Sequence, residues 1–408
     1  MIYEPETVKG FQDFLPEKAR ERAKIKEVIE RYFKLYGFLP IETPTIEFDE
    51  LMRTDATIEK EDEAVSDRFR LKDRGSRNLG LRYEFTFQLP RILKQNPNLK
   101  LPFKRYQIGS VFRDEPTSSN RFREFTQCDA DIIGDSSIES DAECISLFSD
   151  ILNELNIKPI IEINNRKLIN SIIESVKIEN KISVMRELDK LDKAGEDTIK
   201  ANLRKYADAN QIITLFKLLE KPLDFFVKNI FEGAEEIEKL RKLSQVYGFK
   251  IKFNPFMVRG FSYYTGNVFE IKIEGTKDSI AAGGRYDKTA GKYLNREIPA
   301  VGISFGLERL TNLAKVKTEK TKAILVSLNK NKESISLAKK LRKNNISCEI
   351  SFGKPGKALE YANSLEIPYA IFIGEEEITK KKFKIKNMQS GEESLLTEKT
   401  IISKLKKS

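Results

Sequence analysis

The sequence predicts an α+β chain: an antiparallel sheet interrupted by a helical insertion, followed by a small α/β domain. Strand-like runs fill residues 102–133 and return at 249–308. Between them, helical patterns dense in Lys, Glu, Leu and Ile take over, and from about residue 321 buried strands alternate with short helices. We therefore expect one domain from residues 1–168 and 244–320, a helical insertion at 169–243, and a last domain at 321–408.

The first half of the chain carries clear local signals. Apolar residues at helical spacing predict a helix over 17–36, ended by Gly37. "FLPIETPTIEFDELM" follows, and its two prolines suit an edge or interface strand. Residues 67–90 alternate in strand fashion around a turn at Asp73–Gly75. "PFKRYQIGSVFRDE" and "REFTQCDADIIG" form a long hairpin, and a helix follows over roughly 138–155.

Composition limits the class of protein. The chain has 408 residues, 40% hydrophobic and 33% charged, with a formal net charge of +10. That excess of positive charge fits a solubilising surface or a polyanionic partner equally well. Three cysteines, an odd number and widely spaced, argue against a disulfide framework and suit a reducing cytoplasm. The N-terminus shows no secretory pattern, and no apolar run approaches the roughly 20 residues of a membrane span, so we expect a cytoplasmic chain.

Histidine is absent from the chain. This excludes a Ser-His-Asp triad, a histidine general base and histidine-ligated zinc. Any catalysis must therefore depend on carboxylates, arginines, tyrosines, a metal ion or the substrate itself.

Three arginines occur in otherwise apolar strand-like segments: Arg113 in "GSVFRDE", Arg259 in "MVRGF" and Arg309 in "GISFGLERL". A buried charge is costly unless it is paired. One such arginine suggests a structural pair with a carboxylate. Three together favour a bound polyanion, because guanidinium groups match phosphate oxygens in geometry.

These segments resemble the class II aminoacyl-tRNA synthetases. "FRDE" with "RFREF" resembles their motif 2, "GISFGLER" their motif 3, and "YGFLPIETPTIE" their motif 1. "RGFSYYTGNVFE" and "AAGGRYDK" are more specific and resemble the signature peptides of histidyl-tRNA synthetase. "LRYEFT", "KGFQDFLPE" and "QCDADI", the last in an archaeal-like form, also match that family. The last domain is similar to the family's anticodon-binding domain.

The resemblance implies a histidine–tRNA ligase that activates histidine with ATP and passes it to the terminal ribose of tRNA(His). Arg113 would hold the α-phosphate and the substrate carboxylate, and Arg259 the α-phosphate from the other side; both are predicted to be catalytic. Arg121 and Arg309 would grip the γ-phosphate. Mg²⁺ would bridge the β- and γ-phosphates, bound mainly by ATP, and no protein residue is assigned as a metal ligand.

The remaining implied contacts divide between adenine and histidine. Glu115 would read the adenine amino group and Phe125 would stack on the ring. Glu84, Thr86 and Gln127 would bind the α-ammonium, while Asp131 and Tyr264 would hydrogen-bond the imidazole nitrogens. The other implied amino-acid contacts are Arg259, Tyr263 and Tyr286. For Tyr263, ordinary half-buried strand packing is the simpler interpretation, whereas for Tyr264 it is not. Gly283 and Gly284 would let backbone approach the substrate.

The sequence departs from the family pattern at a few positions. Phe261-Ser262 stands where the family usually has Leu-Asp, and Tyr83 follows an arginine usually followed by proline. Asp131 is shorter than the Glu of bacterial relatives. These departures bear on specificity and rate, and they remove no implied phosphate contact.

Two other functions remain open. A regulatory paralogue would keep the fold without ligating, although such a relative would be expected to lose the arginines and often the last domain. A class II ligase for another amino acid is disfavoured by Asp131, Tyr264 and "GGRYD". The leading hypothesis also implies a homodimer formed through the motif 1 region (Gly37–Glu47). It implies tRNA contacts by the hairpin loop "DEPTSSNRFRE" and by basic stretches such as "KKKFKIKN", and neither a membrane nor a DNA partner.

Overall fold

The computed structural model describes residues 4–52, 67–118, 121–258, 263–275 and 279–407. The chain divides into two compact units, Met1–Val316 and Lys317–Ser408. The α+β fold class is confirmed, because the first unit holds a large, mostly antiparallel sheet and the second has its own sheet.

The large sheet of the first unit has the strand order β1-β5-β6-β11-β10-β9-β7-β8. Its two edge pairs, β1–β5 and β7–β8, are parallel, and all other pairs are antiparallel. The strands are β1 (Leu39–Pro40), β5 (Phe103–Phe112), β6 (Glu124–Ile133), β7 (Pro159–Asn165), β8 (Ile251–Phe253), β9 (Asn267–Ile273), β10 (Ala281–Arg285) and β11 (Ala300–Gly306).

A smaller sheet with the order β2-β4-β3 lies in the same unit. It consists of β2 (Ile46–Phe48), β3 (Arg70–Lys72) and β4 (Asn78–Leu81). The prediction of strand structure throughout 67–90 was therefore too long. After β4 the chain leaves the sheet, and Pro90 lies at the start of a short helix, where its missing N–H costs nothing.

The other regular elements described in this unit are helical. α1 and α4 match the predicted helices, and the helices α5–α11 follow one another over residues 166–247. The helices are α1 (Pro16–Leu35), α3 (Leu89–Gln95), α4 (Ile138–Glu154), α5 (Arg166–Ser175), α6 (Lys181–Asp189), α7 (Leu191–Ala194), α8 (Glu196–Leu203), α9 (Ala209–Leu219), α10 (Leu223–Lys228), α11 (Ala234–Tyr247) and α12 (Leu307–Leu313), with 3-10 turns η1 (Asp49–Met52) and η3 (Lys292–Leu294).

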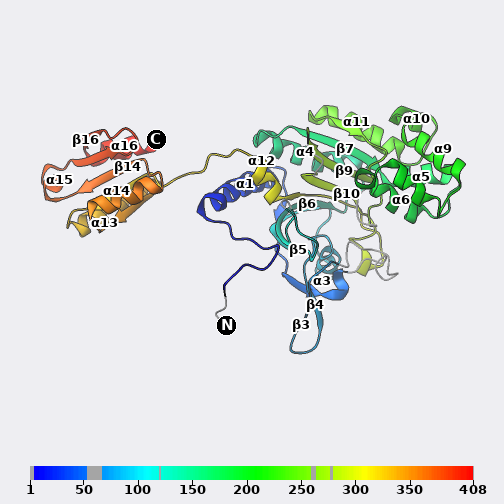
Figure 1. Cartoon of the computed structure of the whole chain (residues 1–408), viewed down its shortest axis with the longest axis horizontal. Helices are drawn as coiled ribbons and strands as arrows, with labels where there is room; N and C mark the ends of the chain where they lie inside the picture. The colour runs from blue at the N-terminus through cyan, green and yellow to red at the C-terminus, as the bar shows by residue number, and fades with distance from the viewer. Residues whose placement is uncertain (1–3, 53–66, 119–120, 259–262, 276–278, 408) are drawn as a thin grey trace. The chain divides into compact units, whose positions relative to one another are not determined.

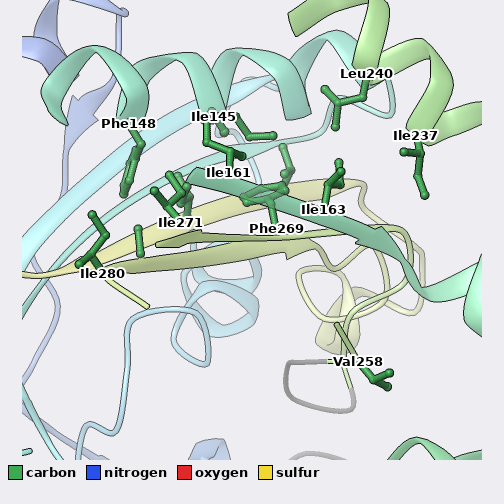
Figure 2. Close-up of a cluster of buried hydrophobic side chains, with 14 of the residues drawn as sticks. Ile145, Phe148, Ile161, Ile163, Ile237, Leu240, Val258, Phe269, Ile271 and Ile280 are labelled. Atoms are coloured by element: carbon green, nitrogen blue, oxygen red, sulfur yellow. The ribbon is translucent and has the colours of Figure 1, made fainter. Parts of the chain in front are cut away.

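The hydrophobic core lies between one face of the large sheet and the helices. α4 and α11 run along that face (Figure 1), and their apolar side chains meet those of β7 and β9 (Figure 2). Phe148 of α4 stacks on Phe305 of β11 with 4.0 Å between ring centroids. The opposite face of the sheet does not contribute to this hydrophobic core.

The second unit is a mixed sheet with the order β13-β12-β14-β15-β16, flanked by helices. β12–β13 and β12–β14 are parallel, as predicted, whereas β14–β15 and β15–β16 are antiparallel. The elements are β12 (Ala323–Ser327), α13 (Asn331–Lys343), β13 (Cys348–Ser351), α14 (Pro355–Ser364), β14 (Tyr369–Ile373), α15 (Glu375–Lys380), β15 (Phe383–Asn387), β16 (Glu393–Leu396) and α16 (Glu398–Lys407).

The antiparallel part of this sheet was not predicted. "KKKFKIKN" was interpreted only as a basic surface, yet its second half is β15, in which Ile385 is buried between lysines. The alternation of apolar and basic residues was the available signal.

We predict that Ile163→Ala destabilises the first unit by about 2–5 kcal/mol, because Ile163 is fully buried on β7 and its loss leaves a cavity. Val246→Ala on α11 is the matched control: Val246 is 84% exposed, so its loss should change stability by less than about 0.5 kcal/mol. Native-state hydrogen exchange of the β7 and β9 amides in increasing denaturant measures both. Equal losses in the two variants would contradict the assigned core.

Candidate active site

One strand provides the floor of a cavity on the open face of the sheet. Successive side chains of a strand point to opposite faces. On β6, Cys128, Ala130 and Ile132 enter the hydrophobic core, whereas Gln127, Asp129 and Asp131 line a cavity of about 290 Å³. The alternation within "QCDADI" therefore divides core from site.

The cavity gathers the predicted site residues that the structure describes, although they are spread over more than 220 positions of sequence. They are Glu84, Thr86, Arg113, Glu115, Arg121, Phe125, Gln127, Asp131, Tyr263, Tyr264, Tyr286 and Arg309. Arg259 lies outside the described residues, as do Phe261 and Ser262.

Arg113 follows directly after β5 and faces two aromatic rings. Its guanidinium carbon lies 4.3 Å from the ring centroid of Tyr83 and 5.1 Å from that of Phe125. Among the described residues no carboxylate lies within ion-pair distance of Arg113, so its guanidinium is available to an anion.

Glu115 and Arg121 form an ion pair at the same end of the cavity, with Arg121 Nε 2.8 Å from Glu115 Oε2. The other carboxylate oxygen accepts a hydrogen bond of 3.1 Å from the hydroxyl of Tyr83. Glu115 is thus held from two directions before any ligand is bound.

Arg309 belongs to the first turn of α12, where its guanidinium donates to the backbone carbonyl of Ser279. The preceding residue, Glu308, fixes the start of this helix to two neighbouring segments. Its carboxylate pairs with Arg22 of α1 at 2.7 Å and accepts 3.1 Å hydrogen bonds from the backbone N–H of Thr126.

The other end of the cavity is built around a buried ion pair. Arg105 of β5 and Asp131 of β6 are register partners, and Arg105 Nη2 lies 2.6 Å from Asp131 Oδ2. Arg105 is fully buried. The hydroxyl of Tyr286 donates to the second oxygen of Asp131, which fixes the carboxylate plane.

Two more carboxylates share this end. Burial raises the pKa of Glu84 to about 7, and the neighbouring charge of Arg113 opposes that rise. Burial likewise raises the pKa of Asp129 to about 7, opposed by Arg105. Tyr263 donates a 3.3 Å hydrogen bond to one oxygen of Glu84, and the other oxygen is buried without a hydrogen-bond partner. That oxygen is available to a cationic ligand.

Gln127 is oriented by its neighbours. Its Nε2 donates to Ser304 Oγ at 2.9 Å and to Asp129 Oδ1 at 3.3 Å. Its Oε1 is buried and has no hydrogen-bond partner. An unsatisfied buried acceptor beside Glu84 favours a ligand that donates hydrogen bonds.

Comparisons with known proteins agree with this geometry. A family model described as "Histidyl-tRNA synthetase" matches residues 10–310, and one described as "Anticodon binding domain" matches residues 322–408. The chain belongs to the histidyl-tRNA synthetase family. The predicted resemblance to that family is confirmed.

Curated relatives and solved structures extend the family match over the whole chain. "Histidine--tRNA ligase 1" of Bacillus cereus is 37% identical over 414 residues, covering 96% of this chain and 94% of that protein. The crystal structure of histidyl-tRNA synthetase from Nostoc sp. has a TM-score of 0.86 at 26% identity and covers 99% of both chains. These relatives are bacterial, and the archaeal-like form of "QCDADI" stays a prediction.

A structure titled as an ATP phosphoribosyltransferase regulatory subunit/histidyl-tRNA synthetase, from Bacillus halodurans, has a TM-score of 0.76. It is 23% identical and covers 88% of this chain and 97% of that chain. At this identity, the likeness shows a common fold alone.

The structure corrects two of the predictions made from the sequence. Arg113 is not inside a strand, because β5 ends at Phe112, and Arg309 lies in the helix α12 that follows β11. Gly283 is needed for close strand packing rather than for substrate access, because an added Cβ would collide with the carbonyl of Gly302. A Cβ added at Gly284 would lie 2.9 Å from the Tyr264 ring.

Several supporting residues were missed by sequence reasoning. Asp129 alternates with apolar residues on β6, and that spacing could have identified it. Arg105 stands between Lys104 and Tyr106 on β5 and gave no such signal. For Tyr83, the sequence indicated only a departure from the family pattern. The local sequence around Arg22 and Ser304 did not indicate a role, because each contacts the site only through the packing of segments that are distant in the sequence.

Within the described ranges, no group of three Asp, Glu or Cys side chains is arranged to hold a metal ion. Glu115 and Glu308, two carboxylates of the cavity lining, are already paired with Arg121 and Arg22.

The raised pKa of Glu84 predicts a pH dependence of stability. The folded state holds this proton up to about pH 7, whereas the unfolded chain loses it near its ordinary pKa of 4.5. The stability contributed by Glu84 is thus complete below the ordinary pKa and is lost as the pH rises through 7. Glu84→Gln should therefore gain stability relative to the parent between pH 5 and pH 8, on the order of 2–3 kcal/mol.

Urea unfolding at pH 5 and pH 8 measures this difference. The control is Glu154→Gln, which removes an exposed carboxylate paired with Arg31 and should keep the pH slope of the parent. An unchanged slope in Glu84→Gln would show that Glu84 is not protonated in the folded state near neutral pH.

Proposed function

We propose that this chain is a histidine–tRNA ligase that forms histidyl-adenylate from histidine and ATP and transfers the histidyl group to tRNA(His). The observation that carries the proposal is one cavity lined both by three arginines (Arg113, Arg121 and Arg309) and by three buried carboxylates (Glu84, Asp129 and Asp131). Such a cavity suits a substrate pair that is anionic at one end and cationic at the other. Membership of the family and the anticodon-binding match support this function.

In the proposed arrangement, ATP lies along the arginine end. Arg113 contacts the α-phosphate and the histidine carboxylate, holding the attacking oxygen near phosphorus. Arg121 and Arg309 bind the γ-phosphate. Glu115 accepts a hydrogen bond from the adenine amino group, and Phe125 stacks on the adenine ring. Magnesium bound to ATP neutralises phosphate charge.

Binding of ATP requires a local change. Arg121 must leave Glu115, with which it is paired at 2.8 Å, to reach a phosphate. Its side chain is 54% exposed, so the exchange of partners involves little desolvation.

Histidine occupies the carboxylate end. Glu84, Thr86 and Gln127 bind the α-ammonium, for which the unpartnered oxygens of Glu84 and Gln127 are suited. Asp131, held by Arg105 and Tyr286, and Tyr264 bind the imidazole nitrogens. A competitor that lacks those nitrogens would leave buried polar groups unpaired, which is the basis of discrimination. Tyr286 and Tyr263 close the pocket.

The reaction needs charge stabilisation more than a protein nucleophile, and that suits a chain without histidine. Arg259 is proposed to contact the α-phosphate opposite Arg113, as well as the histidine carboxylate. Arg259→Ala should lower the rate of adenylate formation far more than histidine affinity, because its contact strengthens as charge develops at phosphorus.

The remaining proposals concern the assembly. tRNA would contact the loop between β5 and β6 and the unit formed by residues 317–408. We propose a homodimer formed through Gly37–Glu47, supported by the exposed side chains of Leu39 (59%) and Ile46 (48%). Sedimentation equilibrium tests the dimer, and a monomer at micromolar concentration would refute it.

We also propose that the protein acts in the cytoplasm, which cell fractionation tests. No helix in the described part of the chain is long and apolar enough to cross a membrane.

A regulatory paralogue is the second candidate, since a related fold occurs in a structure titled as a regulatory subunit. Against it, this chain retains Arg113, Arg121 and Arg309 around the cavity and matches the anticodon-binding family over residues 322–408. A ligase with altered amino-acid specificity is a third.

ATP–pyrophosphate exchange with each of the twenty amino acids separates these functions. We expect exchange with histidine, and Arg113→Ala should lower its kcat/KM about 10²- to 10³-fold. The control is Arg31→Ala, which removes an exposed arginine of α1 and should leave exchange unchanged. Exchange with another amino acid would establish altered specificity. A folded chain that binds ATP but exchanges with none would be regulatory.

A further inference from the structure

Tyr83 lies behind the nucleotide end of the cavity rather than in its lining. It is 2% exposed and follows Arg82, whose backbone is tied to two neighbouring segments. The N–H of Arg82 donates to Thr45 at 2.9 Å, and its carbonyl accepts from Phe112 at 3.0 Å. Arg82 Nε also donates to the carbonyl of Ser110 at 2.7 Å. The backbone next to Tyr83 is therefore fixed to the end of β5.

The hydroxyl of Tyr83 holds one oxygen of Glu115. The hydrogen bond to Glu115 Oε1 is 3.1 Å, and Arg121 occupies Oε2. Burial raises the pKa of Tyr83 well above its ordinary value, so the hydroxyl stays a donor at every working pH. If Arg121 moves to a phosphate, Tyr83 is the contact that still orients this carboxylate.

The ring and backbone of Tyr83 hold Arg113. The guanidinium carbon of Arg113 lies 4.3 Å from the Tyr83 ring centroid, within the range of a cation–π contact. The carbonyl oxygen of Tyr83 accepts from Arg113 Nε at 3.4 Å. One buried residue thus contacts both the proposed adenine reader and the proposed α-phosphate arginine.

We propose that Tyr83 is a positioning residue for nucleotide recognition: it aims Glu115 at the adenine amino group and Arg113 at the α-phosphate. This inference rests on the proposed function, which assigns those two contacts. An ionised carboxylate accepts hydrogen bonds only, so an aimed Glu115 favours the 6-amino group of ATP over the 6-oxo group of ITP. Tyr83 is then a determinant of purine selectivity that never touches the nucleotide.

The test compares ATP and ITP binding by titration calorimetry in the parent and in Tyr83→Phe, which keeps the ring and removes the hydroxyl. We expect the ATP-over-ITP preference to fall about 3- to 10-fold, through weaker ATP binding, because a hydrogen bond to a charged group is lost. The KM for histidine in ATP–pyrophosphate exchange should stay unchanged. Tyr83→Leu also removes the ring beneath Arg113 and should in addition lower kcat for exchange.

The matched control is Tyr106→Phe. Tyr106 is 4% exposed and donates a 3.0 Å hydrogen bond to Glu30, on the core side of the sheet and away from the cavity lining. The Tyr106→Phe variant should be less stable than the parent and should keep the ATP-over-ITP preference of the parent.

Three outcomes would overturn the inference. An unchanged ATP-over-ITP preference in Tyr83→Phe, with a parent that binds ATP, refutes the positioning role alone. Equal weakening of both nucleotides together with a lowered Tm assigns Tyr83 a structural role only. Absence of ATP binding by the folded parent refutes the proposed function and this inference with it.

Discussion

The organisation of this protein depends on the two-residue period of the strand β6. Cys128, Ala130 and Ile132 are directed into a hydrophobic core beneath α4 and α12, and Gln127, Asp129 and Asp131 are directed into the cavity. A shift of one residue in register would exchange the two sets and bury Asp129 and Asp131 among isoleucines. Ten residues of antiparallel pairing with β5 secure the register against that shift.

The floor of the cavity combines one buried guanidinium group with three buried carboxyl groups. Arg105 is a fully buried guanidinium, and it faces more than one carboxylate because Asp131, Asp129 and Glu84 lie on the same side of the sheet. Its pairing with Asp131 compensates the desolvation of both groups. The remaining carboxylates are stabilised in their protonated form by burial. A cationic group of a ligand would supply the missing positive charge, which couples binding to ionisation.

Family motifs predicted the fold class, the family and the set of residues around the cavity. These features could be predicted because the motifs contain the side chains that contact ligands. Arg105, Arg22 and the position of Tyr83 beneath Arg113 could not be predicted, because such supporting contacts arise from packing between segments that no motif joins. Gly283 was misinterpreted for the same reason: it is opposed by the backbone of β11, which the sequence does not identify as its neighbour.

The sequence by itself determined which chemistry is available: no histidine, several arginines in strand-like segments, and alternating aspartates on one strand. It determined the type of most elements too, because periodicity depends on local geometry. Only the tertiary structure decided which charges are paired. Arg105 and Arg113 lie eight residues apart on the same hairpin, yet one is paired with a buried carboxylate and the other faces aromatic rings. That difference comes from which neighbouring strands and loops pack over each guanidinium, and this is a property of the assembled sheet.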